Sequence, residues 1–327
     1  MPILIRRLLF YAVTAFVAIS VNFFLPHMMP GNPVQAMLAS AGPSLDHRAV
    51  AALQAQFGVG TGQSLLAQYW NYWSALFHGN LGVSISHYPD TVTTVIGSSL
   101  WWTVILVGTA TILSFIIGTF VGALVGWRRG SALDQILPTA TFFQAIPYFF
   151  LGTVLLYFFA EQLHWFPDDF KGYDTNNYVI GLNPGFVGSA IQHAALPALT
   201  IVLSSVAGWI VGMRNMMVTT MDEDYVLVAQ AKGLPNRRVV YYAARNAVLP
   251  SISGFANALS FVVAGSLLTE LVFSYPGVGN LLLGAVSAED YPLIQGIFLI
   301  ITFAVLAANL LADTVYVMLD PRTRQEA

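Results

Sequence analysis

The sequence predicts an all-α, polytopic membrane protein, and three observations support this fold class. First, 56% of the 327 residues are hydrophobic and only 9% are charged, whereas about a quarter of the residues of a soluble domain are charged. Second, apolar stretches long enough to cross a bilayer recur along the chain between polar intervals. Third, the basic residues gather in polar intervals that would share one side of a membrane. Cysteine is absent, which excludes disulfides, thiolate metal sites and a cysteine nucleophile.

The first span is expected within residues 1–28. Arg6 and Arg7 precede the apolar run 8–25, as in a secretory signal peptide. No small-residue cleavage site follows that run, so the sequence predicts an uncleaved transmembrane helix. Asn22, a polar residue inside this helix, is expected to contact another helix.

Residues 29–98 are expected to form a helical region outside the cytoplasm. The pattern predicts amphipathic helices at 46–57 and 65–77. The aromatic residues of the second helix include Tyr69, Trp70, Tyr72 and Trp73. Because their rings are amphipathic, such residues favour the membrane–water interface. Stacking on bases or sugars is an alternative that the sequence leaves open.

A core with five further spans is expected at residues 99–319, followed by a cytoplasmic tail at 320–327. The expected spans lie at 99–127, 135–160, 191–213, 252–273 and 293–319. Three glycines of the first of these, Gly118, Gly122 and Gly126, share one helix face and predict close packing against another helix.

Prolines predict irregularities in two of these spans. Pro138 and Pro147 are expected to kink the span at 135–160, and Pro197 is expected to break the span at 191–213. Neighbouring helices must then satisfy the backbone groups that the prolines release.

The charge distribution orients the six spans. If the arginines at 6 and 7 are cytoplasmic, alternation places eleven of the thirteen Lys and Arg residues on that side, leaving only Arg48 and Lys171 outside. This bias sets orientation in membranes. Both termini and the interval 221–250 are therefore expected to be cytoplasmic.

The interval 221–250 is the longest polar segment expected on that side, and its pattern predicts two short helices around a turn. Acidic residues lie in the first turn of the first helix, where the helix dipole favours them. Gly233 and Pro235 end that helix, and Asn236 is expected to cap a second helix at 237–246. A hairpin of this kind suits docking on a partner. Packing against the protein's own helices is an alternative that the pattern leaves open.

Common motifs of enzymatic chemistry are missing from the chain. It has no GxxxxGK[ST] to bind nucleotide phosphates, no HExxH and no GxSxG. Ionisable residues inside spans are functional candidates because burying a charge in lipid is costly. Here these residues are Glu270 and Asp313, and structural hydrogen bonding is the favoured interpretation of both.

A polar loop at 161–189 carries three acids, Asp168, Asp169 and Asp174. Their spacing matches no calcium-binding loop, so they are interpreted as solvated. His193, which follows the loop, is interpreted as a hydrogen-bonded structural residue.

Four ordered motifs resemble the membrane subunit of the oligopeptide/dipeptide branch of ABC importers. They are PGNP at 30–33 with QY at 68–69 and LFHGNLG at 76–82, the hairpin at 224–250, ELVFSYPGVG at 270–279, and LDPR at 319–322. The resemblance covers almost the whole chain and implies the type I ABC importer permease fold with six transmembrane helices. The chain departs from the usual pattern at Asn32, Asn80, Val228, Tyr242 and Ala244.

The resemblance implies a permease subunit in the plasma (inner) membrane of a bacterium or archaeon, forming half of the translocation pathway for peptides or a similar small solute. The implied partners are a second homologous permease, two ABC ATPases that bind ATP and Mg, an extracytoplasmic solute-binding protein, and membrane lipid. The chain itself would hold no cofactor or metal, catalyse no reaction and bind no nucleic acid. The implied ATPase-coupling residues are Asp224, Tyr225, Ala229, Ala231, Lys232, Gly233, Leu234, Arg237, Arg245 and Asn246.

Two other classes of function are weighed against this one. An ion-coupled secondary transporter would use Glu270 or Asp313, but it would ordinarily show an internal repeat and paired intramembrane acids, and neither is evident. A membrane enzyme would need a facing nucleophile and base, and no span offers a convincing pair.

Overall fold

The computed structural model describes residues 3–28, 64–167, 169–260, 262 and 267–319. The helix expected at 46–57 and the tail at 320–327 lie outside these residues. Within them the regular structure is helical, apart from an antiparallel β-bridge between Val83 and Thr91, which confirms the all-α class. The chain divides into two compact units, residues 1–103 with 276–307 and residues 104–275 with 308–326.

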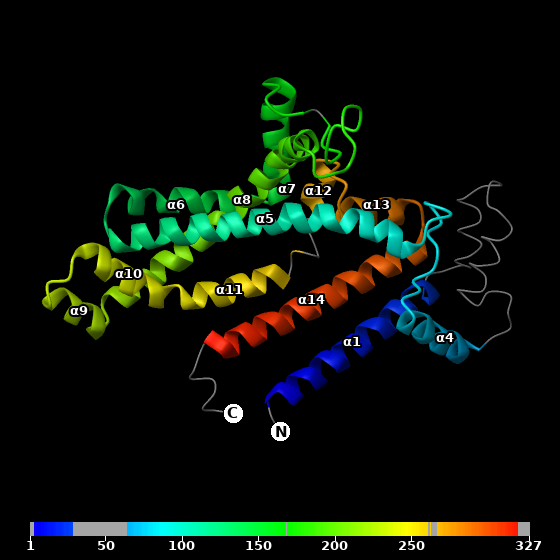
Figure 1. The fold of residues 1–327 in the computed structure, drawn as a ribbon, viewed down its shortest axis with the longest axis horizontal. Helices are drawn as coiled ribbons and strands as arrows, with labels where there is room; N and C mark the ends of the chain where they lie inside the picture. The colour runs from blue at the N-terminus through cyan, green and yellow to red at the C-terminus, as the bar shows by residue number, and fades with distance from the viewer. Residues whose placement is uncertain (1–2, 29–63, 168, 261, 263–266, 320–327) are drawn as a thin grey trace. The chain divides into compact units, whose positions relative to one another are not determined.

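The helices of the first unit come from both ends of the chain (Figure 1). They are α1 (Ile3–His27), α4 (Leu65–Phe77), the start of α5 (Val92–Trp127), α13 (Val278–Ser287) and most of α14 (Tyr291–Leu319). Its core contains Ile96 of α5, Ala285 of α13 and Ile297 of α14, all fully buried. The bounds of α4 are those that the sequence predicts.

Polar and aromatic side chains join α1 to its neighbours in this unit. The side-chain amides of Asn22 and Gln295 each donate to the backbone carbonyl of the other residue, both at 2.9 Å. This exchange confirms that Asn22 is a helix-contact residue. The ring of Phe23 packs against Tyr69 and Tyr72 of α4, with ring centroids 5.3 and 5.5 Å apart. Placement of α4 at a membrane surface stays a prediction.

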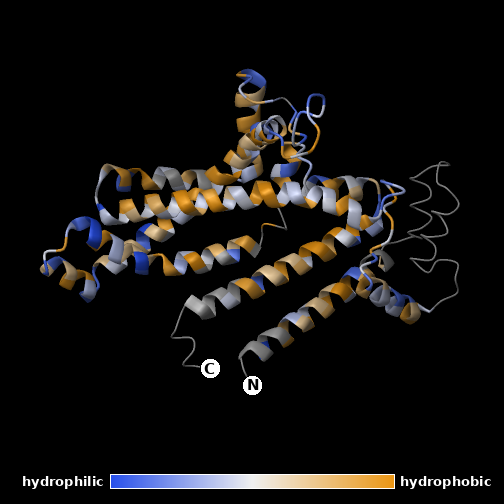
Figure 2. Cartoon of the chain, in the orientation of Figure 1, coloured by the Kyte–Doolittle hydropathy of each residue, from blue (hydrophilic) through white to orange (hydrophobic). Residues whose placement is uncertain are grey.

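The second unit holds the rest of α5 and the helices that follow it in sequence. They are α6 (Ala132–Ala145), α7 (Tyr148–Leu155), a π-helix (Leu156–Gln162), α8 (Pro184–Met221), α9 (Asp224–Ala231), α10 (Asn236–Ala247), α11 (Leu249–Ser260) and α12 (Leu267–Val272). Figure 2 shows apolar residues along α5 and α8, whereas hydrophilic residues collect around α9 and α10.

The glycine face of α5 packs directly on α8, as the sequence predicts. A Cβ atom at Gly118 would lie 2.3 Å from the Cβ of Trp209, and one at Gly122 would lie 2.5 Å from the carbonyl oxygen of Ile210. One at Gly126 would lie 2.7 Å from the Cβ of Met217. The two backbones can approach this closely only because these positions lack side chains.

Three described helices are long and apolar enough to cross a membrane: α5, α8 and the part of α14 at Tyr291–Leu311. Shorter apolar helices lie at Leu9–Phe24 and Val278–Ser287. Together they agree with a polytopic, all-α membrane protein.

The proline predictions are partly wrong. The chain leaves the helical conformation at Ile146, immediately before Pro147, because a residue that precedes proline disfavours helical dihedral angles. Helix α8, in contrast, continues through Pro197 over its 38 residues, so the break expected there is wrong. Helix α6 includes Pro138, and the kink expected at that residue stays a prediction. Packing of α8 against its neighbours holds the helix together despite the backbone hydrogen bond that Pro197 removes.

The span expected at 252–273 is not one helix. Helix α11 begins at Leu249 and takes Pro250 into its first turn, where proline is tolerated because the N–H it lacks has no helical partner. It ends at Ser260, and Val262 lies in a turn. The short α12 buries Thr269 and Glu270 completely and packs on α7 and α8, a setting that suits these polar residues better than lipid does.

Candidate functional site

The segment 221–250 forms the expected helical hairpin, called here the α9–α10 hairpin. Asp224 lies in the first turn of α9, and Lys232 is its C-cap. Gly233 has a φ angle of +73°, in the left-handed region that glycine adopts without strain. Helix α10 is preceded by Pro235 at the N-cap, so the prediction that Asn236 caps it is wrong. The fixed φ angle of proline sets the direction of the chain there without a side-chain cap.

The inner face of the hairpin is fixed to the end of α8. Val226 of α9 and Val239 and Ala243 of α10 are fully buried in one core with Met213 and Met217 of α8. Ala247 belongs to the same core, since residues four apart lie on one face of α10. The hairpin and the end of α8 are therefore one packed body.

The outer face of α9 is apolar and uncovered. Tyr225, Leu227 and Val228 are 42%, 51% and 51% exposed, respectively. Ala231 is also exposed, whereas Ala229 and Leu234 are partly buried against the hairpin core. Val226 is the residue of α9 that faces the core, an orientation that the sequence pattern left undetermined.

Two ion pairs join the end of α8, next to the hairpin, to the start of α6 and to the turn between α5 and α6. Arg214 of α8 donates from Nε and Nη2 to the two carboxylate oxygens of Asp134, at 3.0 and 3.1 Å. Hydrogen bonds from Arg214 and from the Gly130 amide hold the pKa of the Asp134 carboxyl below its usual value. Arg129 pairs with Asp222, the C-cap of α8, at 2.9 Å. Nothing in the sequence indicates these partners, which lie 80 and 93 residues apart.

The remaining candidate residues are spread over the chain. Arg237, Arg245 and Asn246 of α10 are exposed, and the Asn246 amide donates to the Tyr242 carbonyl at 3.4 Å. Glu270 is 0% exposed within the second unit. Asp313 lies in α14, and its side chain falls outside the described part of the structure.

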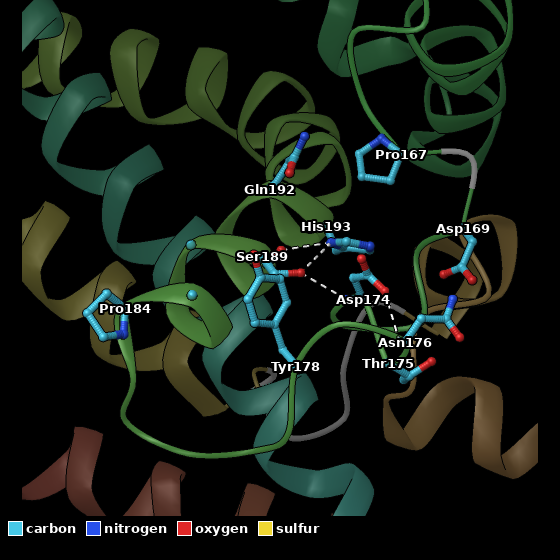
Figure 3. A pocket seen from close by; sticks show the side chains of 12 residues that line it. Pro167, Asp169, Asp174, Thr175, Asn176, Tyr178, Pro184, Ser189, Gln192 and His193 are labelled. Carbon is cyan, nitrogen blue, oxygen red and sulfur yellow. Dashed lines mark hydrogen bonds between the residues drawn. The ribbon is translucent and has the colours of Figure 1, made fainter.

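A polar cavity of about 680 Å³ lies between the loop after the π-helix and the first turns of α8 (Figure 3). The Nδ1 atom of His193 is 2.7 Å from the carbonyl oxygen of Ser189, the residue one turn earlier. The hydroxyl of Ser189 accepts from the backbone amide of Asp174 at 2.8 Å. His193 is thus a buried, hydrogen-bonded residue of α8, and Ser189 binds the loop to this helix.

The two acids that line this cavity, Asp169 and Asp174, bind other groups of the same loop. Asp174 accepts from the backbone and side-chain amides of Asn177 and from the Asn176 amide, and these bonds hold the pKa of the Asp174 carboxyl below its usual value. Asp169 pairs with Lys171 at 3.2 Å. Burial raises the pKa of Asp169, but the bonds and charge of Lys171 outweigh burial and lower it. No group of His, Asp and Glu within the described residues is arranged to hold a metal ion.

Comparisons with known proteins agree with this architecture. Residues 118–325 match the family described as the inner membrane component of binding-protein-dependent transport systems. A probable peptide ABC transporter permease of Sinorhizobium fredii is 32% identical over 98% of both chains. A putative peptide permease of Brucella suis is 31% identical over 92% of both chains. The glutathione transport system permease GsiC of Escherichia coli K12 is 30% identical over 98% of both.

The family match covers the glycine face of α5, the end of α8 and the α9–α10 hairpin. The chain therefore belongs to the family of inner membrane components of binding-protein-dependent transport systems, and it is a permease subunit of an ABC importer.

Proposed function

We propose that the α9–α10 hairpin is the contact through which ATPase subunits drive this permease. The observation that supports it most is the outer face of α9, where Tyr225, Leu227 and Val228 are exposed beside the polar ends of the helix. Apolar side chains grouped in this way on a polar segment are typical of a protein interface. Asp224, Lys232 and Gly233 flank this face and complete the candidate contact.

The packing of the hairpin supports a mechanical role. Because Val226 and Val239 share a core with Met213 and Met217, a partner that displaces α9 would also displace the end of α8. Helix α8 is in turn packed on α5 through the glycine face. In this mechanism ATP closes the ATPase dimer, the hairpin follows, and the spans alternate between inward and outward access.

The proposed assembly has five components: this chain, a second homologous permease, two ATPases and an extracytoplasmic solute-binding protein. ATP and Mg are bound by the ATPases, and this chain contributes no cofactor of its own. Both termini and the hairpin face the cytoplasm, because that orientation places eleven of thirteen Lys and Arg residues inside. Residues 29–98 then lie outside, where they can contact the binding protein or the second permease.

Peptides or similar small solutes are the proposed cargo. The relatives are named for peptide and glutathione transport. Oligosaccharides and metal chelates are the alternatives, and the ligand bound by the partner solute-binding protein distinguishes them.

The coupling role is tested by changing the outer face of α9. Leu227→Glu combined with Val228→Glu places two charges on the proposed apolar contact, and we expect the affinity for the ATPase subunits to fall roughly thirtyfold or more, about 2 kcal/mol. Co-purification from membranes measures the loss. Leu182→Glu is the matched control, because Leu182 is 99% exposed and lies in the loop before α8. Retention of the ATPases by the double variant would refute the contact.

An ion-coupled secondary transporter is the competing function. Uptake into proteoliposomes that contain the complete importer should require ATP and survive a protonophore. Uptake that continues without ATP and stops when the membrane potential is lost would favour the competing function.

A further inference from the structure

Helix α10 exposes a row of basic and aromatic side chains on the side opposite its buried face. The buried face consists of Val239, Ala243 and Ala247. The exposed row, called here the basic stripe, consists of Arg237, Arg238, Tyr241, Tyr242 and Arg245. Since residues four apart share a helix face, the row runs along most of the helix.

The basic stripe is not neutralised within the described part of the protein. Helix α10 contains three arginines and no acid. Asp222 is engaged by Arg129 and Asp134 by Arg214, whereas Glu223 and Asp224 at the start of α9, both described, form no ion pair with the stripe. Among the described residues, no carboxylate lies within ion-pair distance of an arginine of the stripe.

The position of α10 in the chain places the stripe near the membrane surface. Helix α8 has 38 residues and is about 57 Å long, whereas the hydrocarbon layer is about 30 Å thick. Helix α10 packs on the last turns of α8 and passes through Val248 into α11, which has no charged residue. Figure 1 shows α10 between α9 and α11. Arg245 is therefore about one helical turn from the apolar segment.

We propose that the basic stripe binds the phosphate groups of acidic phospholipids at the membrane surface. The guanidinium group of arginine donates paired hydrogen bonds to phosphate, and tyrosine rings favour the level of the headgroups. Basic residues beside a membrane segment are attracted to acidic lipid. The stripe thus combines the charge, the geometry and the location that such a headgroup requires.

The two helices of the hairpin then have different binding partners. The exposed face of α9 contacts the ATPases, and α10 contacts lipid, although the resemblance counts Arg237 and Arg245 among the coupling residues. The lipid-binding proposal takes only one premise from the proposed function, namely that the hairpin faces the cytoplasm. Lipid binding is measured without transport, so the two proposals can fail separately.

The helix geometry predicts a graded contribution. Arg237 lies about 12 Å farther along the helix from the apolar segment than Arg245 does. Attraction to charged lipid decays within about 8 Å at physiological ionic strength. Arg245 is therefore expected to contribute most.

The test uses the purified importer complex, titrated with phosphatidylglycerol or phosphatidylcholine, with retained lipid counted by native mass spectrometry. A basic residue at an acidic surface contributes about a fivefold factor in affinity. We expect Arg245→Gln to weaken phosphatidylglycerol binding by about that factor, and the triple variant R237Q/R238Q/R245Q to weaken it further, to about tenfold in all, because the two more distant arginines are largely screened. Phosphatidylcholine binding should not change. Lys171→Gln, which removes one exposed charge from the loop before α8, is the matched control and should retain phosphatidylglycerol.

A crosslinking experiment tests the same proposal without removing charge. With p-benzoylphenylalanine in place of Tyr241, illumination of membranes should give an adduct with the mass of a phospholipid. An adduct with an ATPase subunit would overturn the proposal and assign the stripe to the protein interface. Undiminished phosphatidylglycerol binding by the triple variant would overturn it as well.

Discussion

The carboxylate of Asp290 accepts a hydrogen bond of 2.5 Å from the hydroxyl of Ser84, a residue 206 positions earlier in the chain. Both residues are fully buried. The same oxygen, Oδ2, accepts from the backbone amides of Ile85 and Ser86 at 2.8 and 2.9 Å and from the Ser86 hydroxyl at 2.7 Å. One side chain before α14 thus fixes the segment that leads from α4 into α5.

Asp290→Asn should loosen that segment. An asparagine in this position turns an NH₂ group or a single neutral oxygen toward several donors, and we expect a loss of about 2–4 kcal/mol in stability. Hydrogen exchange at the amides of Ile85 and Ser86 should accelerate. Asp90→Asn is the control, because Asp90 lies in the same segment with its side chain exposed. Unchanged exchange in Asp290→Asn would contradict the anchoring role.

Gly122→Ala should separate α5 from α8. The added methyl group would lie 2.5 Å from the Ile210 carbonyl oxygen and 2.8 Å from the Met213 Cβ, so the helices must move apart, at a cost of about 1–3 kcal/mol. Thermal unfolding in detergent measures the loss. Gly212→Ala in α8, which meets no atom within 4 Å, should be neutral or stabilising by up to about 1 kcal/mol. Equal stability of the two variants would rule out the close approach.

The Arg214–Asp134 pair should make part of the free energy of unfolding depend on pH in the acid range. The pKa of Asp134 is lowered in the folded protein, so the pair stabilises fully above the ordinary aspartate pKa of about 4. This stabilisation is lost as the pH falls through the lower, folded-state pKa. Arg214→Gln should therefore flatten the fall of the melting temperature with pH in the acid range. Arg128→Gln, a change at the nearby end of α5, should leave the slope as it is. A slope unaffected by Arg214→Gln would show that the pair contributes nothing.

Gly233→Val should damage coupling more than it damages insertion into the membrane. Valine at a φ angle of +73° is strained by about 1–2 kcal/mol, although no atom lies within 4 Å of its Cβ position. The turn must then change conformation and displace α9. Uptake per ATP hydrolysed is the measurement, with Gly233→Asn as control, since asparagine tolerates left-handed dihedral angles. Normal coupling in the valine variant would exclude a role for this turn.

Local patterns identified the elements whose signals lie within a few turns of chain. The bounds of α4, the glycine face of α5 and the turn at Gly233 all follow from residues close in sequence. The helix breaks were predicted less well, because α8 continues through the buried Pro197, whereas the chain leaves the helical conformation just before Pro147. Helix propensity gives the local free-energy cost of a proline, but packing against other helices determines whether the helix forms despite that cost.

In the candidate site, too, local sequence patterns predicted the helices but not how they pack. Helical spacing and a glycine turn identified the hairpin, and the resemblance to importer permeases supplied the residues proposed for coupling. Its orientation depends on which face of α9 meets Met213 and Met217, and neighbouring apolar residues such as Val226, Leu227 and Val228 offer several choices to a sequence pattern. Exposure of Leu227 and Val228 therefore came from the structure alone.

The sequence by itself determined that the chain is a helical membrane protein without motifs for nucleotide chemistry, because composition and hydrophobic run length are local properties. Only the tertiary structure decided which distant groups meet: Asp290 with Ser84, Arg214 with Asp134, and the glycines of α5 with α8. Such contacts depend on complementary shape and charge across tens to hundreds of residues. No local pattern specifies that complementarity, so it becomes visible only when the chain is folded.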